Sequence, residues 1–170
     1  QGSLALRYAA FTQGEQRIVD HADLFARIDA AVAANPQAIA VRAVDGEASY
    51  AQFDARVRQI AARLLAMGIG KGDKVAVHLD RSIDLAAAVV AVMRAGAVFV
   101  PLDPSYPREH IDYTLGDSGA GVVVTQSSLA DHLPEFYGFV LDLDSLPTPS
   151  ADIAAPAYPA LGAEDIAYLL

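Results

Sequence analysis

The sequence predicts an α/β fold, in which helices layer on a mostly parallel sheet and a small β-hairpin lies near the amino-terminal end. Three observations predict it. Apolar residues recur at helical spacing in some segments and form strand-like runs in others, turn residues separate these segments, and the two kinds of segment alternate along the chain. With 170 residues, of which 54% are hydrophobic, the chain can bury a core, and one compact unit is expected.

The first predicted elements are a helix and a hairpin. Residues at helical spacing define the helix: Leu24, Ile28, Ala31 and Val32. It ends at Asn35-Pro36, because the residue before a proline is pushed out of helical backbone angles. Residues 38–44 follow as a strand, and Asp45-Gly46 predicts a hairpin turn, since both positions tolerate a positive φ.

A capped amphipathic helix is predicted next. Ser49 and Gln52 have the spacing of a capping box, in which each side chain binds the backbone N–H of the other residue. The apolar stripe of this helix consists of Phe53, Val57, Ile60 and Leu64. Gly68 is placed to end the helix in a left-handed backbone conformation.

The middle of the chain predicts a strand, a helix and a second strand. Residues 74–79 form the first strand, and the turn Asp80-Arg81-Ser82 offers N-cap side chains to a helix that runs to about Ala95. Gly96 closes this helix, and residues 97–100 form a buried strand. Replacing Gly96 with valine is therefore expected to destabilise the fold by at least about 1–2 kcal/mol.

The following loop is stiffened by Pro101, Pro104 and Pro107. Pro107 suits the first turn of a helix that continues through Leu115, because its fixed φ is compatible with that position. Residues 121–125 are predicted to form the next strand.

The carboxyl-terminal part contains two more predicted strands and a connection. Residues 139–143 form one strand, and residues 146–161, rich in proline, alanine and serine, are predicted to form an extended surface connection. Residues 166–170 begin another buried strand. Because a natural terminus is seldom so apolar, we expect the sequence to be truncated at this point.

Composition argues against several partners. The 12 basic and 21 acidic residues give a net charge of −9, so a nucleic-acid backbone would be repelled. Cysteine is absent, which is typical of a reducing compartment and favours the cytoplasm. The longest apolar stretch, residues 85–102, contains Arg94, Gly96 and Pro101, so it predicts a buried helix and strand and no membrane span.

Three short motifs imitate functional sites. Gly68-Ile69-Gly70-Lys71-Gly72 resembles a phosphate loop, but it follows a helix and has Gly72 where a hydroxyl should bind magnesium. Gly116-Asp117-Ser118-Gly119 resembles the surroundings of a protease nucleophile, but Ser118 ends a predicted helix. Asp142 and Asp144 alternate with leucines, which predicts the solvated face of a strand and no acid/base pair.

The histidines do not form a metal-binding pattern. They lie far apart in the sequence, and none has the spacing of metal ligands, so we interpret them as surface or capping residues: His21, His78, His110 and His132. No residue of the chain is accordingly predicted to be catalytic, cofactor-binding or metal-binding.

Two longer stretches carry a family resemblance. The first is Ala48-Ser49-Tyr50-Ala51-Gln52-Phe53; the second begins at Met93-Arg94-Ala95-Gly96-Ala97-Val98-Phe99-Val100-Pro101-Leu102-Asp103 and continues to Leu115-Gly116-Asp117-Ser118. They are similar to the first two core motifs of the adenylation domains of nonribosomal peptide synthetases. The resemblance covers about residues 24–170. Gln52 and Phe53 depart from the common Glu and Leu, and both suit a capped amphipathic helix.

The resemblance implies a ligase that activates amino acids. The whole enzyme would use ATP and Mg to form an aminoacyl-adenylate and would pass the acyl group to the phosphopantetheine thiol of a peptidyl carrier protein, as in antibiotic biosynthesis. In the family, the phosphate loop follows a strand similar to residues 165–170, and the amino-acid pocket and catalytic lysine come later. Lys71 and Lys74 match none of these positions. We therefore expect this chain alone to bind neither ATP nor Mg and to be inactive.

The same resemblance sets boundaries and leaves alternatives. Residues 1–22 are expected to be an N-terminal extension or linker, without the features of a signal peptide, and residues 23–170 the N-terminal portion of an adenylation domain truncated before the phosphate loop. One alternative is part of an acyl-CoA or aryl-acid ligase, which shares the fold. The other is a non-catalytic docking or structural module that contacts a neighbouring synthetase domain or a small accessory protein.

Overall fold

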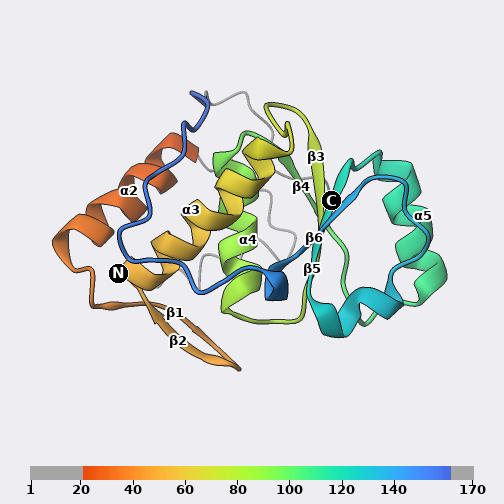
Figure 1. Ribbon diagram of the computed structural model, residues 1–170, viewed down its shortest axis with the longest axis horizontal. Coiled ribbons are helices and arrows are strands. Elements are labelled where there is room, and N and C mark those ends of the chain that lie inside the picture. Colours follow the sequence, from red (N-terminus) through yellow and green to blue (C-terminus); the bar gives the residue numbers. More distant parts are fainter. Residues whose placement is uncertain (1–20, 162–170) are drawn as a thin grey trace.

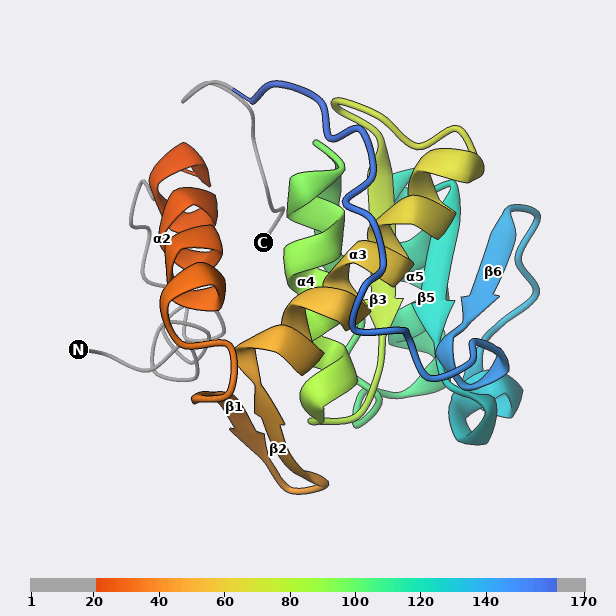
Figure 2. The same cartoon turned by 60° about the vertical axis from the view of Figure 1, so that its left-hand side comes forward.

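The computed structural model of the protein describes residues 21–161. A four-stranded sheet separates two helical layers, with α3 and α4 on one face and α5 on the other (Figure 1). The helix α2 and a two-stranded hairpin lie outside α3 and α4, on the side away from the sheet (Figure 2). The predicted α/β fold is therefore confirmed.

The elements follow one another in the predicted order. The helices are α2 (His21–Ala34), α3 (Tyr50–Ala66), α4 (Ile83–Arg94) and α5 (Arg108–Ser118), with short 3-10 helices η1 (Ser127–His132) and η2 (Leu143–Ser145). The strands are β1 (Ile39–Ala43), β2 (Gly46–Ser49), β3 (Lys74–His78), β4 (Val98–Pro101), β5 (Val122–Thr125) and β6 (Phe139–Asp142).

The hairpin forms where the sequence predicts it, with its turn one residue earlier. Ala43 of β1 pairs with Gly46 of β2, so the two loop residues are Val44 and Asp45. Gly46 has a φ of 132° and is already the first strand residue. The loop residues Val44 and Asp45 have no positive φ, so the positive φ that the sequence predicts for the turn occurs at the glycine that starts β2.

Both ends of α3 confirm the predicted caps. Ser49 Oγ accepts a hydrogen bond from the Gln52 N–H at 3.2 Å, and Gln52 Oε1 accepts one from the Ser49 N–H at 2.9 Å. At the other end Gly68 has a φ of 86°, and the Gly68 and Ile69 N–H groups bind the carbonyls of Leu65 and Leu64. The predicted stripe is buried: Phe53, Val57, Ile60 and Leu64.

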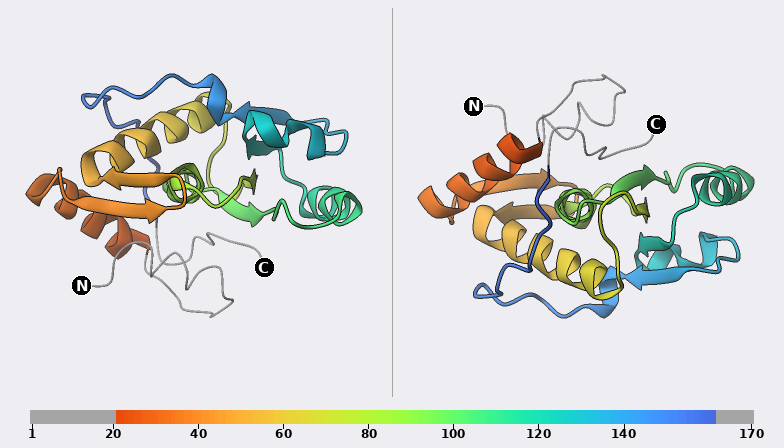
Figure 3. Two further views of the ribbon diagram at one scale, coloured as in Figure 1. Left: turned by 90° about the horizontal axis from the view of Figure 1, so that it is seen from below. Right: turned by 90° about the horizontal axis from the view of Figure 1, so that it is seen from above.

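The larger sheet is parallel throughout, in the order β4-β3-β5-β6. Its helices α4 and α5 lie on opposite faces, as the views from below and above show (Figure 3). Side chains alternate between these faces: Val75 and Val77 of β3 join the core under α3 and α4, whereas Ala76 joins the smaller core under α5. The sheet is therefore covered on both sides, as parallel sheets are.

The helix α5 continues through Leu115 and ends at Ser118, as predicted, and Gly119 follows with a φ of 70°. Two details differ from the sequence predictions. The strand β6 ends at Asp142, and residues 143–145 turn into η2. Asp142 and Asp144 are therefore not the solvated face of one strand; the Asp142 carboxylate accepts the Asp144 N–H at 2.9 Å and caps η2.

Residues 146–161, which we call the strap, contain no helix or strand, as predicted. The strap runs across α3 (Figure 2), and α3 binds its backbone: Gln59 Nε2 donates to the Pro147 carbonyl at 2.8 Å and Arg58 Nη1 to the Ile153 carbonyl at 2.9 Å. The strap is therefore a docked part of the fold. The predicted strand at residues 166–170 and residues 1–20 of the predicted extension, residues 1–22, lie outside the described residues; α2 begins at His21, within that extension.

Candidate functional site

The carboxyl edge of the parallel sheet is the candidate functional site because of the sheet topology. Strands β4 and β5 flank β3 on opposite sides, so the direction in which the chain adds strands reverses at β3. In open α/β sheets, ligands bind outside the carboxyl ends of the strands at such a switch point. The residues that leave these strand ends decide what this part of the chain can bind.

Asp80 and Gln126 join the two loops that leave β3 and β5. The Asp80 N–H donates to Gln126 Oε1 at 3.1 Å, and Gln126 Nε2 donates to Asp80 Oδ2 at 3.2 Å. Gln126 Nε2 also donates to Ser128 Oγ at 2.8 Å. The chain's own polar groups therefore meet across the switch point and satisfy one another there.

The neighbouring carboxylates at this edge also bind the chain's own donors. Asp103, after β4, accepts the Ser105 N–H at 2.9 Å, and hydrogen bonds from the Ser105 backbone and hydroxyl lower the pKa of Asp103 below 3.8. After β6, Asp142 accepts the Ser127 hydroxyl at 2.6 Å and Asp144 accepts the Ser127 N–H at 2.9 Å. This edge therefore carries negative charge, which opposes the binding of a phosphate chain here.

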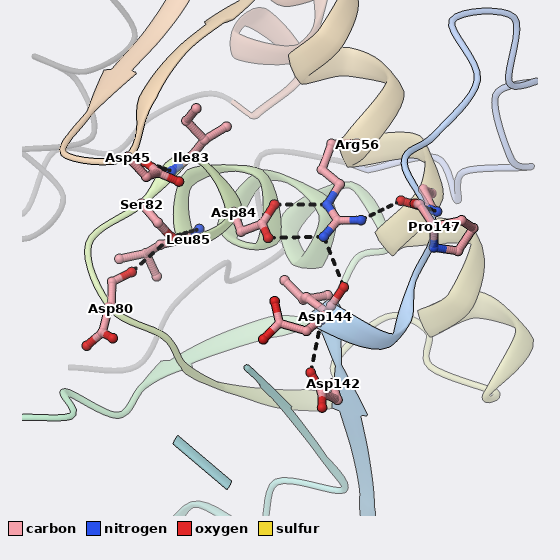
Figure 4. Close-up of polar contacts among 12 residues, drawn as sticks. Asp45, Arg56, Asp80, Ser82, Ile83, Asp84, Leu85, Asp142, Asp144 and Pro147 are labelled. Atoms are coloured by element: carbon pink, nitrogen blue, oxygen red, sulfur yellow. Dashed lines mark hydrogen bonds and ion pairs between the residues drawn. The ribbon is translucent and has the colours of Figure 1, made fainter. Parts of the chain in front are cut away.

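Arg56 of α3 fixes the start of α4 and the exit from β6 (Figure 4). Its guanidinium forms a two-pronged ion pair with Asp84, with Nε–Oδ1 at 2.9 Å and Nη2–Oδ2 at 3.0 Å. Nη2 also donates to the Leu143 carbonyl at 3.1 Å, and Nη1 donates to Gln59 Oε1 at 2.7 Å. The Arg56 side chain is 14% exposed, so this fork is screened less than an open surface pair. The positive charge of Arg56 is therefore paired with Asp84 within the fold.

Arg94, at the end of α4, is buried between two aromatic rings. Its guanidinium carbon lies 4.8 Å from the ring centre of Phe25 in α2 and 5.1 Å from that of Tyr158 in the strap. Arg94 Nη2 also donates to Asp29 Oδ1 at 2.7 Å. The motif residue Arg94 thus holds α2, α4 and the strap together by cation–π contacts and an ion pair.

The buried carboxylate of Asp54, on α3, also interacts with the charge of Arg94. Asp54 is buried and pairs with Arg58, Nε–Oδ2 at 2.9 Å. Burial raises the pKa of Asp54 above 3.8 and outweighs the opposing charges of Arg58 and Arg94. Burial also raises the pKa of the Tyr158 hydroxyl. These perturbed groups are explained by the packing of α2, α3, α4 and the strap.

The glycine-rich turn at residues 68–72 lies at the other edge of the sheet, before β3. The Gly70 N–H donates to Asp73 Oδ2 at 2.8 Å, and the Gly72 N–H donates to the Gly96 carbonyl at 3.1 Å. Since these backbone donors bind the chain itself, the prediction of a helix-to-strand turn is confirmed. The prediction for Ser118 is also confirmed, because this residue ends α5.

The interpretation of the histidines is wrong for His78. His110 and His132 are exposed on α5 and η1, but His78 is fully buried at the end of β3. The signal in the sequence was its place in the apolar run Val75-Ala76-Val77-His78-Leu79, where a polar residue shares the burial of its neighbours. Among residues 21–161, no group of three or more potential ligand side chains is arranged to hold a metal ion.

Sequence reasoning also missed the Arg56–Asp84 and Asp80–Gln126 pairs, because the two residues are 28 positions apart in the first pair and 46 in the second. These groups bind one another within the fold, so none of them presents a free cradle for ATP or Mg. Within the same part of the chain, no helix has the length and apolar character needed to cross a membrane. The prediction that the chain has no catalytic or cofactor-binding residue stays a prediction.

Comparisons with known proteins match most of the chain. A family model described as "AMP-binding enzyme" matches residues 28–170. Chondramide synthase cmdD of Chondromyces crocatus is 38% identical over 144 residues, 81% of this chain and 4% of that protein. Phosphinothricin tripeptide synthetase PhsB of Streptomyces viridochromogenes is 38% identical over 139 residues, 79% of this chain and 12% of that protein.

Solved structures agree with the fold. The nonribosomal peptide synthetase FmoA3, solved with α-methyl-L-serine-AMP bound, superimposes with a TM-score of 0.75 at 33% identity, over 84% of this chain and 16% of that one. The N-terminal subdomain of Klebsiella oxytoca NpsA, in complex with 3-hydroxybenzoyl-AMSN, gives a TM-score of 0.71 at 25% identity, over 84% and 36%. The chain thus spans a small part of the proteins that it matches.

Proposed function

Since the chain belongs to the AMP-binding enzyme family, we propose that it is the N-terminal portion of an adenylation domain that activates an amino acid. The single observation that carries this proposal is the family match over residues 28–170. The relatives that support it include a tripeptide synthetase, and the FmoA3 structure holds an aminoacyl-AMP. The domain boundary at residue 23 belongs to the same proposal.

The proposed reaction of the whole enzyme has two steps. An amino-acid carboxylate attacks the α-phosphate of ATP to give an aminoacyl-adenylate and pyrophosphate, and a bound Mg would supply positive charge for this step. A carrier-protein phosphopantetheine thiol then attacks the acyl carbon; a thioester forms, the acyl–phosphate bond breaks, and AMP and the thiol proton are released. A solved fusion of NpsA with a carrier domain supports a peptidyl carrier protein as partner. Neighbouring synthetase domains, a small accessory protein and a cytoplasmic location are part of this proposal.

The described residues contribute a scaffold to this activity. Arg56 and Arg94 tie α2, α3, α4 and the strap into one layer, and the Asp80–Gln126 pair joins the strand ends. Neither arginine is available for an anionic substrate, because both are paired with carboxylates inside the fold. We therefore propose that the phosphate loop, the amino-acid pocket and the catalytic lysine follow Leu170, and that this chain alone is inactive.

Amino-acid-dependent exchange of pyrophosphate into ATP tests the proposal. The 170-residue chain should show no exchange above background, whereas a longer protein that carries the chain and its whole downstream region should exchange with one or a few amino acids. Adding only the loop after Leu170 should not restore exchange, because the pocket and lysine would still be missing. Exchange by the 170-residue chain itself would refute the proposed location of the site.

An aryl-acid ligase is the second candidate, because the NpsA subdomain that shares this fold was solved with a 3-hydroxybenzoyl ligand. The same exchange assay separates the two, with aryl acids in place of amino acids. A longer protein that exchanges with neither, but binds a neighbouring synthetase domain, would instead support a docking module.

A further inference from the structure

Two fully buried polar side chains lie side by side at the carboxyl ends of the central strands. His78 is the last residue of β3 and Thr125 the last residue of β5, and they are register partners in the parallel ladder. Both are 0% exposed. Because partners in register project from the same face of a sheet, both side chains lie on the α5 face, as Ala76 and Val123 two residues earlier do.

The hydrogen bond to Leu102 assigns the proton on the His78 ring. Nδ1 lies 3.0 Å from the Leu102 carbonyl oxygen, and a carbonyl oxygen only accepts, so Nδ1 carries the hydrogen. A neutral ring then presents Nε2 as an acceptor.

Thr125 supplies the complementary group. Its Oγ1 and His78 Nε2 are both buried, and neither has a hydrogen-bond partner among residues 21–161. Thr125 thus offers an O–H donor and His78 an acceptor on adjacent strands. Buried polar groups in native proteins are nearly always satisfied by protein or by internal water. Because His78 and Thr125 are register partners on adjacent parallel strands, which lie about 4.8 Å apart, a single water molecule between them is within reach of both side chains.

We propose that one internal water molecule binds between these side chains. The water accepts a hydrogen bond from the Thr125 hydroxyl and donates one to His78 Nε2. Together with the Nδ1 bond to Leu102, it completes a buried polar chain that crosses β5, β3 and the exit of β4. This series of buried hydrogen bonds lies at the switch point, where Asp80 and Gln126 join the ends of the same two strands.

Nuclear magnetic resonance of the histidine-labelled 170-residue chain tests the site without any substitution. The expected result is a neutral His78 ring protonated at Nδ1, and a nuclear Overhauser contact between a long-lived water and the Thr125 methyl group or the His78 ring. A proton on Nε2, or a direct Thr125–His78 hydrogen bond without water, would overturn the proposal.

A double-mutant cycle gives an independent measurement. Thr125→Val removes the hydroxyl and keeps the side-chain shape, so it should lower the urea midpoint of unfolding, whereas Thr125→Ser should retain the coupling to His78. In a His78→Phe background the Thr125→Val shift should shrink, because the acceptor at the other side of the water is gone. As a control, Thr114→Val in α5 should give the same shift in both backgrounds. Equal Thr125→Val shifts in both backgrounds would refute the bridge.

Discussion

Substituting Gly96 and Gly68 with alanine compares two helix ends that have the same backbone conformation and different surroundings. Gly96 ends α4 with a φ of 79°, and Gly68 ends α3 with a φ of 86°. A Cβ at either position is strained by roughly 1–2 kcal/mol, because L-residues avoid the left-handed region. This cost should appear in both variants and should cancel when they are compared.

The surroundings differ because the strap packs on Gly96. A Cβ built on Gly96 would lie 3.0 Å from Lys71 Cγ and 3.2 Å from both Pro159 Cγ and Leu161 Cδ2, whereas a Cβ on Gly68 meets nothing within 4 Å. Overpacking of this kind costs about 1–3 kcal/mol. Gly96→Ala should therefore destabilise the chain by about 2–5 kcal/mol in total, and Gly68→Ala by only about 1–2 kcal/mol.

Urea unfolding followed by circular dichroism measures this difference. With an m-value of roughly 2 kcal/mol/M, the Gly96 midpoint should fall about 0.5–1.5 M below the Gly68 midpoint. Gly70→Ala is the baseline, because Gly70 has no positive φ and open space around it, and it should leave the midpoint unchanged. Equal shifts for Gly96→Ala and Gly68→Ala would show that the strap contact contributes no energy, and would refute this reasoning.

Two further predictions concern charged groups in the α3 layer, beside the exchange assay described above. Arg56→Lys should lower the free energy of unfolding by about 1–3 kcal/mol, because lysine cannot form the two-pronged ion pair with Asp84 and reach the Leu143 carbonyl together. The exposed Arg42–Glu47 pair of the hairpin provides a control: Arg42→Lys should shift the unfolding midpoint by almost nothing. The pKa of Asp54 is raised in the folded state, so its buried negative charge lowers the free energy of unfolding. This loss of stability is complete above the folded-state pKa and disappears as the pH falls towards the ordinary pKa of 3.8. The wild-type chain should therefore gain stability relative to Asp54→Asn as the pH is lowered from about 6 to about 4. Unfolding curves at several pH values measure this, and a relative loss at low pH would contradict it.

The features that could be predicted from the sequence are those that depend on neighbours along the chain. The Ser49–Gln52 capping box and the glycines that end α3 and α4 are encoded within a few residues, so short patterns identified them. The Arg56–Asp84 fork could not be identified in this way, because an arginine on a helix surface has many possible partners until the helices are packed. The burial of His78 is indicated by its local apolar run, whereas its position beside Thr125 depends on the pairing of β3 with β5, which no local pattern specifies.

The same difference explains the strap. Its composition predicts an extended connection, and composition does not reveal that residues on α3 bind it. The 3-10 helix η1 was also missed, since a single short turn after a strand leaves a weak pattern.

Recognition of the strap through its carbonyl oxygens has a consequence for how its sequence can vary. Gln59 and Arg58 bind groups that every amino acid possesses, so most of the strap's side chains are not needed to define its route. Other positions are tied to particular side chains: Leu146 packs against the core, Tyr158 lies beside Arg94, and Pro159 and Leu161 lie beside Gly96. We therefore expect the route of residues 146–161 to depend mainly on residues of α3 and α4. A library that randomises the other positions of the strap should retain the fold, whereas substitutions of the strap-binding residues in those two helices should not.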